Sequence, residues 1–295
     1  MFQPLIPHNE GFMKTTLIIP CYNEAAGIPQ LAERLKALIP LLSVDGDVEI
    51  LFVDDGSVDG TAGRIREFLA GLPFRIVTHE INRGLGAALR TGFSSSRGEE
   101  IVTMDSDCTY DPIGVLDLLA KLRSGYDVVT GSPYHPEGEV VNVVPWRLML
   151  SKALSRLYWM VLPDPLYTYT SCFRAYRRNI LENLESTSNG FLAVTELLVS
   201  AILQHARIAE IPERLHSRRF GASKINVVRV SISHLKYLIR VLLWRITGFP
   251  MKADQAKDFA NAGTRQTIRT VSIDKPGPYG IRPIKEKQWR HAPAE

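Results

Sequence analysis

Two aspartates that follow a short, mostly apolar run could together bind a divalent cation. The run is residues 101–104, and Asp105, Ser106 and Asp107 come directly after it. If the run is a buried strand, both carboxylates project where it meets solvent. They can then share one hard ion, which prefers oxygen ligands and takes further positions from water and phosphate. Because most Asp-x-Asp triplets are solvated loop acids, the triplet needs support from the rest of the chain. With that support it indicates Mg²⁺ or Mn²⁺ and a phosphate-bearing substrate.

The elements that must position this pair are indicated by two further apolar runs. Residues 14–20 and 48–53 are β-rich, and each is followed by a polar turn and a helical pattern, at 28–42 and 61–72. The repeated order of strand, polar turn and helix is typical of βαβ units on a parallel sheet. The sequence therefore predicts an α/β protein with a mostly parallel sheet flanked by helices.

The polar turns also predict where the site lies. In a parallel α/β sheet the ligand crevice lies beyond the carboxyl ends of the strands. Tyr22, Glu24 and Asp55 follow the first two runs, as Asp105 and Asp107 follow the third. We therefore expect three clusters of polar side chains to meet in one cleft.

Six motifs in order carry a resemblance to a known family. They are LIIPCYNE (17–24), VDDGSVDGT (53–61), NRGLGAALRTGF (82–93), MDSDCTYDP (104–112), TSCFRAYRR (170–178) and RRFGASK (218–224). Several motifs in the right order are far more specific than any one of them. By these motifs the chain resembles the GT-A-type, family 2 nucleotide-sugar glycosyltransferases, and among them it is most similar to dolichol-phosphate (polyprenyl-phosphate) mannosyltransferases. The resemblance covers residues 14 to about 235.

The resemblance implies an activity and a donor site. It implies an inverting, metal-dependent glycosyltransferase that moves a hexose from a nucleotide-diphosphate sugar, GDP-mannose or a UDP-hexose, to a polyprenyl-phosphate-type acceptor. Pro20, Tyr22 and Glu24 would then hold the nucleoside, and Val53 and Asp55 would contact the base and ribose.

The resemblance also implies which residues hold the metal and the diphosphate. Residues 105–107, with Ser106 in the middle, match the family's Asp-Ala-Asp, so that Asp105 and Asp107 would bind Mg²⁺ or Mn²⁺. Arg218 and Lys224 match basic residues that family members place on the phosphates. This chemistry is reasonable because departure of a nucleoside diphosphate needs its charge neutralised by a metal and fixed cations. Asp107 and Arg218 are therefore candidate catalytic residues.

The chain departs from the family at two positions. Thr109 stands where some members supply a glutamine ligand, and Pro133 follows the predicted strand 127–131 where the mannosyltransferases have an arginine. A proline cannot bind an anion as an arginine does. Either another cation replaces that arginine, or the acceptor is not a lipid phosphate. The nearest candidate cations are Arg147, Lys152 and Arg174.

Glu196 is the third candidate catalytic residue, and its role depends on the acceptor. It lies in a helical run, residues 193–203, where the resemblance puts an acid near the acceptor. A hydroxyl acceptor needs a carboxylate to take its proton. A phosphate acceptor is already an anion, so Glu196 would then orient the sugar or brace Arg218. A helix carboxylate paired with a nearby arginine is an equally good interpretation.

The C-terminal third contains a candidate membrane-binding helix. Residues 225–246 are amphipathic and basic, and no Asp or Glu occurs from 214 to 253, although the net charge of the chain is only +4. Such a helix suits an anionic membrane surface, but it could equally pack on the catalytic domain or a second subunit. No run approaches the roughly 20 apolar residues of a membrane span. We expect a cytoplasmic protein with peripheral contact at the inner face of the membrane.

The domain boundaries that we predict are an N-terminal extension (1–13), a catalytic domain (14–224), the amphipathic helix (225–250) and a flexible tail (251–295). The three cysteines have no zinc or disulfide spacing, so a reducing compartment is expected. P-loop and dinucleotide motifs are missing, and no aromatic-basic stripe indicates nucleic acid. A non-catalytic nucleotide-sugar-binding protein is the rival from another class. The four acids Glu24, Asp55, Asp105 and Asp107 argue against it.

Overall fold

A computed structural model provides the structure of the chain. It describes residues 14–163, 165–218, 220, 227–247 and 269–272, without the side chains of Arg147 and of residues 269–272. Lys224, the extension 1–13 and most of the predicted tail therefore lie outside the described residues.

The described residues form one central sheet of eight strands, in the order β10-β3-β2-β1-β4-β7-β5-β8. Most neighbours are parallel, whereas β7 is antiparallel to β4 and β5, and β10 is antiparallel to β3. The strands are β1 (Thr15–Cys21), β2 (Val48–Asp54), β3 (Phe74–Thr78), β4 (Glu100–Thr103), β5 (Val128–Ser132), β7 (Arg174–Arg177), β8 (Ile208–Pro212) and β10 (Arg269–Ser272). Two short strands, β6 (Glu139–Val141) and β9 (Arg214–His216), form a separate parallel pair.

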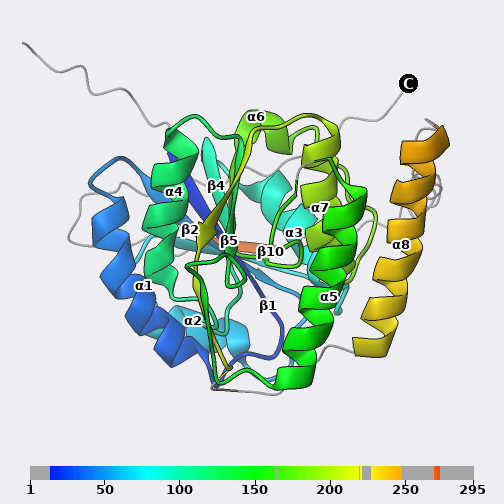
Figure 1. Cartoon of the computed structure of the whole chain (residues 1–295). Helices are drawn as coiled ribbons and strands as arrows, with labels where there is room; N and C mark the ends of the chain where they lie inside the picture. The colour runs from blue at the N-terminus through cyan, green and yellow to red at the C-terminus, as the bar shows by residue number, and fades with distance from the viewer. Residues whose placement is uncertain (1–13, 164, 219, 221–226, 248–268, 273–295) are drawn as a thin grey trace, which may run out of the picture.

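Helices cover both faces of this sheet, as Figure 1 shows. One face packs against α1 (Ile28–Leu42), α2 (Thr61–Phe68) and α4 (Val115–Arg123), which follows the short helix η1 (Pro112–Gly114). The other face packs against α3 (Leu85–Ser95), α5 (Pro145–Val161), α7 (Leu192–Leu203) and α8 (Val227–Thr247). The short helix α6 (Arg178–Leu181) follows β7 directly.

The two cores arise from the two-residue period of the strands. Along β1, the side chains of Leu17 and Ile19 point into the core beneath α1, and that of Ile18 points into the core beneath α3 and α7. Both faces of the strand are buried, which is why its sequence is apolar almost throughout rather than alternating. The predicted α/β architecture with a mostly parallel sheet is confirmed.

The expected elements occur with small differences at their ends. The helix predicted for 28–42 has those bounds, whereas the one predicted for 61–72 ends at Phe68. A turn follows it, in which Leu72 N–H donates to the Leu69 carbonyl at 3.0 Å and Gly71 has a φ of +91°. The amphipathic pattern over 225–246 corresponds to α8.

The helix α5, which has 17 residues and lies beside α8, was not predicted from the sequence. Nor was β10, which lies within the segment 251–295 predicted to be a flexible tail and pairs with β3 at the sheet edge. The rest of that segment lies outside the described residues.

Candidate active site

Three loops meet at the carboxyl edge of the sheet. The strands β2, β1 and β4 are neighbours and run parallel, so the loops that follow them start side by side. Backbone to side-chain hydrogen bonds tie the first two loops together. Asn23 N–H donates to Ser57 Oγ, Val58 N–H donates to Asn23 Oδ1, and Glu24 N–H donates to Thr61 Oγ1, each at 2.8 Å. The Glu24 carboxylate also lies near Asp105, which follows β4, since its charge acts to raise the pKa of Asp105.

Arg218 joins two of the acids that the sequence singled out. Its guanidinium forms an ion pair with Glu24, and its Nη1 lies 3.9 Å from Asp107 Oδ2. Its Nε donates to the Phe220 carbonyl at 2.6 Å. All three charged side chains are only 11–20% exposed. Glu24 and Asp107, two of the acids expected to meet in one cleft, thus both lie close to Arg218.

Asp105 completes this cluster. Burial and the neighbouring Asp107 carboxylate raise the pKa of Asp105 to about 7, while Arg218 acts to lower it. Asp107 in turn accepts a hydrogen bond from Thr109 N–H at 3.1 Å, which fixes one of its oxygens. A carboxyl group held near a second carboxylate in this way favours a cation, which would relieve their repulsion.

The donor set suits Mg²⁺ or Mn²⁺, which prefer oxygen ligands. Among the described residues there is no group of three or more His, Cys, Asp or Glu side chains that could hold a metal. Two carboxylates would therefore leave most coordination positions to water and to a phosphate ligand, as is usual for Mg²⁺.

A polar cavity of about 180 Å³ opens beside Asp105. Hydroxyl groups dominate its wall, and two of them, Ser151 Oγ and Thr170 Oγ1, lie 3.2 Å apart. The lining residues are Asp105, Thr109, Tyr110, Pro133, Tyr134, Ser151, Thr168, Thr170, Ser171, Cys172 and Leu215. The hydroxyl-rich lining of this cavity was not predicted from the sequence, although residues 170–172 fall in one of the family motifs.

The three candidate replacements for the family arginine differ in their surroundings. Arg174 is fully buried, and its guanidinium donates to Thr130 Oγ1 at 3.1 Å and to the carbonyls of Tyr169 and Val194. It therefore cannot reach a ligand. Lys152 lies with its Nζ 5.3 Å from the ring centre of Tyr134, which lines the cavity. Of the two candidates whose side chains the structure describes, Lys152 is the one beside the cavity.

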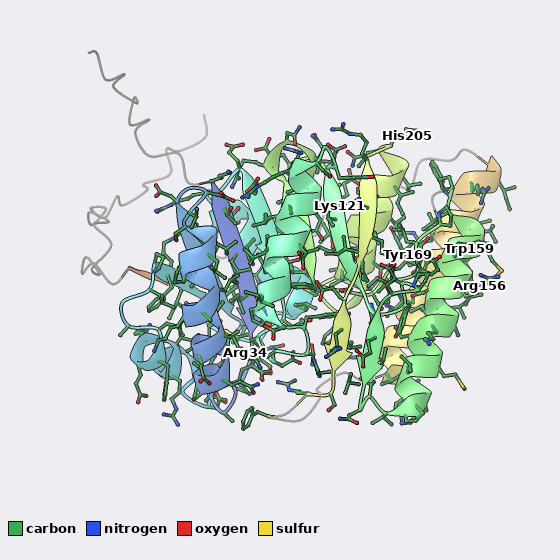
Figure 2. The ribbon with its side chains drawn as sticks, turned by 60° about the vertical axis from the view of Figure 1, so that its left-hand side comes forward. Arg34, Lys121, Arg156, Trp159, Tyr169 and His205 are labelled. Atoms are coloured by element: carbon green, nitrogen blue, oxygen red, sulfur yellow. The ribbon has the colours of Figure 1, made fainter. Side chains whose placement is uncertain are left out.

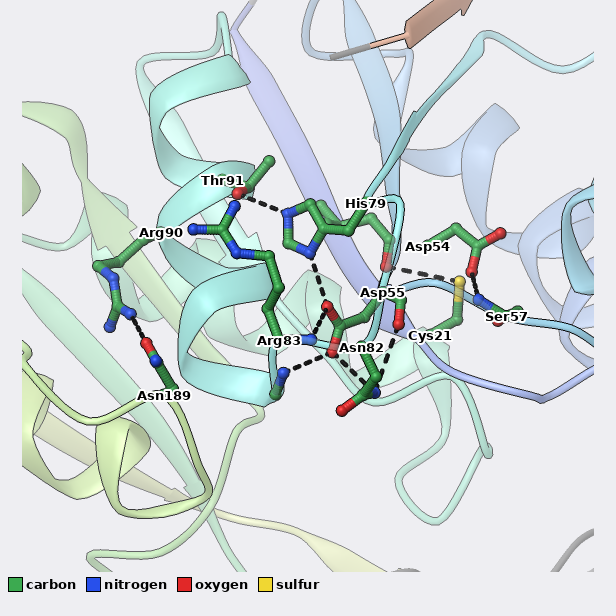
Figure 3. A network of polar contacts seen from close by, with 12 residues as sticks. Cys21, Asp54, Asp55, Ser57, His79, Asn82, Arg83, Arg90, Thr91 and Asn189 are labelled. Carbon is green, nitrogen blue, oxygen red and sulfur yellow. Dashed lines mark hydrogen bonds and ion pairs between the residues drawn. The ribbon is translucent and has the colours of Figure 1, made fainter. Parts of the chain in front are cut away.

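Asp55 is buried, and all its acceptor positions are used by the protein (Figure 3). Its Oδ1 lies 2.6 Å from His79 Nδ1 and accepts from Arg83 N–H at 2.9 Å. Its Oδ2 accepts from Asn82 Nδ2 at 3.0 Å and from Gly84 N–H at 2.7 Å. The carboxylate thus fixes the loop before α3. A contact with the base and ribose would replace one of these bonds, so that role stays a prediction.

The remaining predicted donor-site residues are placed as follows. Pro20 and Val53 are paired in the sheet and buried, so their side chains support the strands rather than line the cleft. Ser106 is also buried, whereas Tyr22 is half-buried just beyond β1.

The Glu196 carboxylate is hydrogen-bonded to the loop 186–188 rather than to the cluster around Arg218. This carboxylate on α7 accepts from Ser186 Oγ at 3.0 Å and from the N–H groups of Thr187 and Ser188 at 2.9 and 2.8 Å. Of the expected roles, bracing Arg218 is wrong in this structure, since the acids that contact Arg218 in the described residues are Glu24 and Asp107.

Arg90 of α3 holds the same loop from the other side. It donates to the carbonyls of Ser186 and Ser188. Burial lowers the pKa of Arg90, and the nearby charge of Glu196 opposes that shift. The interpretation of Glu196 as a helix carboxylate near an arginine therefore agrees with the geometry. Gly86 permits this packing, because a Cβ there would lie 2.1 Å from the Ser188 carbonyl.

The fold and the cluster together define a class of protein. A parallel α/β sheet with acids and one arginine gathered at its carboxyl edge is the arrangement of enzymes that bind ligands at that edge. Comparison with known sequences specifies the class further. The chain belongs to glycosyl transferase family 2, whose sequence profile matches residues 16–185. It is therefore a glycosyltransferase.

Two curated proteins are similar to most of this chain. The chain is 34% identical to a polyprenol monophosphomannose synthase of Mycolicibacterium smegmatis over 80% of this chain and 88% of that protein. It is 28% identical to a dolichol-phosphate mannosyltransferase of Pyrococcus furiosus over 79% of this chain. The matched region spans only 64% of the Pyrococcus protein.

Solved structures share the fold. Glucosyl-3-phosphoglycerate synthase of Mycobacterium tuberculosis, in complex with Mn²⁺, UDP and phosphoglyceric acid, superposes with a TM-score of 0.59 at 22% identity, covering 80% of this chain and 79% of the other. The same synthase in complex with Mg²⁺ and UDP gives a TM-score of 0.59 as well. These similarities confirm the GT-A fold.

Proposed function

We propose that this glycosyltransferase is an inverting, metal-dependent enzyme that transfers a hexose from a nucleotide-diphosphate sugar, GDP-mannose or a UDP-hexose, to a polyprenyl phosphate. The observation that carries the proposal is the cluster of Glu24, Asp105, Asp107 and Arg218 beside a hydroxyl-lined cavity. The names of the curated relatives support a lipid-phosphate acceptor.

The residues of the cluster have complementary roles in this proposal. Asp105 and Asp107 would hold Mg²⁺ or Mn²⁺, which when bound neutralises charge on the diphosphate. Arg218 adds a fixed cation where the leaving diphosphate gains charge, and such preorganised groups stabilise a transition state strongly. Glu24 keeps Arg218 in place through their ion pair. The cavity beside Asp105 would hold the hexose through its hydroxyl groups.

A phosphate acceptor fits the surroundings of this cavity better than a hydroxyl acceptor does. A hydroxyl needs a general base within hydrogen-bonding reach. Glu196 is engaged by the loop 186–188, and Asp105 is the one acid among the described residues that line the cavity. A phosphate oxygen attacks as an anion and needs no base. Lys152, beside Tyr134, is the cation that we assign to the acceptor phosphate in place of the family arginine.

The polyprenyl chain of the acceptor would contact the enzyme at a membrane-binding surface formed by α5 and α8. Exposed apolar side chains occur on both helices, and Figure 2 shows Arg156 and Trp159 on the outer side of α5. On α5 they are Trp146, Met149, Leu150, Leu157, Trp159 and Met160, and on α8 they are Val228, Ile232, Leu235, Ile239, Leu242, Leu243 and Ile246. The described residues contain no helix that is both long and apolar enough to cross a membrane. We therefore infer peripheral contact through this surface.

The test combines nucleotide-sugar binding with sugar transfer. A thermal-shift panel of GDP-mannose and UDP-hexoses with Mn²⁺ or Mg²⁺ should select one donor, because a ligand at a hundred times its dissociation constant stabilises the fold by about 2.7 kcal/mol. The selected donor should then glycosylate polyprenyl phosphate. In Asp105→Asn both the metal-dependent shift and transfer should fall, by about a hundredfold or more for transfer.

Asp117→Asn is the matched control, because Asp117 is an exposed aspartate of α4. It should behave as the wild type does. Nucleotide-sugar binding without transfer to any acceptor would favour the non-catalytic rival. Transfer that proceeds unchanged in Asp105→Asn would overturn the assigned metal site.

A further inference from the structure

The carboxylate of Glu210, in the edge strand β8, connects two segments that line the cavity beside Asp105, although Glu210 itself does not line it. The segments are the turn 132–135, after β5, and the loop 166–172, before β7. We propose that Glu210 is a positioning residue that holds these two segments in place for the hexose of the donor. The inference rests on the proposed function, in which this cavity holds the hexose, and it names a residue that governs recognition of the sugar.

The two-residue period of β8 places Glu210 on the side of the sheet where the cavity segments meet. Its neighbours Ala209 and Ile211 pack in the core beneath α1, α2 and α4, so the Glu210 side chain lies on the opposite face. In the parallel register of β8 and β5, Ser132 is two residues beyond the partner of Glu210 and shares that face. Burial raises the pKa of the Glu210 carboxyl, and a hydrogen bond with Ser132 acts against that shift.

The first segment that Glu210 holds is the loop 166–172. One carboxylate oxygen accepts from the N–H group of Tyr167 and the other accepts from that of Thr168, both at 2.7 Å. Hydrogen bonds to a carboxylate are shorter and stronger than those between neutral groups. Thr168 is buried and lines the cavity. The position of the Thr168 hydroxyl group therefore depends on the Glu210 carboxylate.

The second segment is tied to the first by side chains of the turn. Ser132 Oγ lies 2.6 Å from Thr168 Oγ1, and it accepts from the N–H groups of Tyr134 and His135 at 3.3 and 3.1 Å. The His135 ring also meets the Tyr167 ring edge-on, with 5.7 Å between their centres. Because Tyr134 lines the cavity, a displacement of Ser132 would move two parts of the lining together.

Fixed hydroxyl groups suit recognition of a hexose. Every hydroxyl group of a sugar can donate and accept hydrogen bonds, and a site built to bond such groups loses affinity when a partner is missing. The diphosphate in the proposed function lies instead at Asp105, Asp107 and Arg218. Since the bonds of Glu210 go to β5 and to the loop 166–172, its replacement should weaken binding of the hexose and spare the nucleoside diphosphate.

The test compares a nucleotide sugar with its nucleoside diphosphate. Calorimetric titration of the full chain with Mn²⁺ would use GDP-mannose and GDP as one pair, and UDP-glucose and UDP as the other. In Glu210→Gln the amide nitrogen cannot accept an N–H group, so one of the two bonds at 2.7 Å is lost. Affinity for the nucleotide sugar should fall about tenfold, while affinity for the nucleoside diphosphate stays within about twofold.

Two further variants test the route from Glu210 to the sugar. Ser132→Ala removes the link between the two segments and should show the same selective loss, so it keeps the test decisive if Glu210→Gln does not fold. Thr168→Val removes a hydroxyl group from the cavity wall. The double variant Glu210→Gln/Thr168→Val should lose less affinity than the product of the two single losses, because residues that act through one contact are not additive.

Ile211→Val is the matched control, because Ile211 is the next residue of β8 and its side chain is buried on the other face of the sheet. The variant should lower the melting temperature and leave both affinities unchanged. A selective loss of nucleotide-sugar affinity in Ile211→Val would assign the effect to β8 as a whole, and the inference would be wrong.

The remaining outcomes separate this inference from the proposed function. Equal loss of both affinities in Glu210→Gln, or no loss of either, would overturn the positioning role and leave the proposed function intact. Losses that multiply in the double variant would show that Glu210 does not act through Thr168, which would also overturn it. A wild type that binds GDP or UDP but neither nucleotide sugar would overturn the hexose site, and both proposals would fail.

Discussion

At the residue scale, the carboxylates near the carboxyl edge of the sheet fall into two kinds. Asp55 and Glu196 are buried, and their carboxylate oxygens accept hydrogen bonds from other groups of the protein. Glu24, Asp105 and Asp107 face Arg218 or each other instead. A carboxylate of the first kind loses protein bonds whenever it binds a ligand, so it serves best to hold a loop. The second kind would be stabilised by a bound cation, and that difference supports the proposal that Asp105 and Asp107 hold the metal.

Glu196→Gln tests this division. The amide nitrogen of glutamine cannot accept the hydrogen bonds that Ser186 and the 187–188 backbone donate, so we expect the free energy of unfolding to fall by about 1–3 kcal/mol. Transfer to polyprenyl phosphate should stay within about tenfold of wild type, because no general base is needed. Urea denaturation and a transfer assay below both melting temperatures measure the two effects.

The exposed Glu185→Gln is the matched control and should change neither quantity. A loss of transfer of about a hundredfold or more at unchanged stability would instead identify Glu196 as a general base. That result would favour a hydroxyl acceptor over polyprenyl phosphate.

At the element scale, α5 and α8 form a unit that the sequence indicated only in part. Tyr158 of α5 is fully buried against α8, where its hydroxyl lies 3.2 Å from His234 Nδ1. Arg245 of α8 donates to the carbonyl of Val161 at the end of α5. The helix predicted as a membrane element is thus also a packed one. Packing on the catalytic domain is thus observed for one side of α8, and membrane contact through its exposed side stays a proposal.

The buried histidine makes this pairing sensitive to pH. Burial lowers the pKa of His234 from 6.5 to about 4. Between these values the unfolded chain binds more protons than the folded one, so stability is full above about pH 6.5 and is lost as the pH falls towards 4. This single group should reduce the free energy of unfolding by about 2 kcal/mol between pH 7 and pH 5.

Urea unfolding of the wild type and His234→Phe at both pH values measures the contribution. The variant should show a smaller loss on acidification, because phenylalanine does not titrate. His205→Asn, at an exposed loop position, should keep the wild-type dependence. Identical pH dependence in wild type and His234→Phe would contradict the assignment.

At the scale of the whole molecule, the active-site cluster and the apolar surface lie in different parts of the fold. The cluster sits at the carboxyl edge of β1, β2 and β4, and the apolar surface covers α5 and α8 on one side of the sheet (Figure 1). The cavity beside Asp105 connects them, because its wall includes Ser151 of α5. In the proposed function, a lipid acceptor that entered along α5 would reach the cavity without crossing the sheet.

Leu235→Gln/Ile239→Gln tests the apolar part of that surface. The two side chains are 53% and 50% exposed on α8, so their loss should weaken binding to neutral vesicles by about tenfold or more, since full burial of such a side chain contributes about 1.5–3 kcal/mol. Val44→Gln/Val58→Gln alters side chains that are 82% and 88% exposed in other loops and should have no effect. The change in tryptophan fluorescence on vesicle binding provides the readout. Equal binding by both double variants would exclude this surface.

The sequence by itself determined the α/β order and the family, and it indicated the pair of aspartates that we propose as metal ligands. Those features depend on local patterns, because a βαβ unit and an Asp-x-Asp at a strand end are both encoded within a few tens of residues. It also placed Glu24, Asp105 and Asp107 together correctly, since parallel strands end at one edge.

Only the tertiary structure decided which polar side chains are available for a ligand. Arg218 and Glu24 are 194 residues apart, and the bonds that occupy Asp55 come from 24 to 29 residues downstream. The Arg174 guanidinium is held in the core by hydrogen bonds to acceptors from three different segments. Hydrogen bonds and burial depend on neighbours brought together by folding, so a residue type at a given spacing indicates a capacity, and its partners in space decide how that capacity is used.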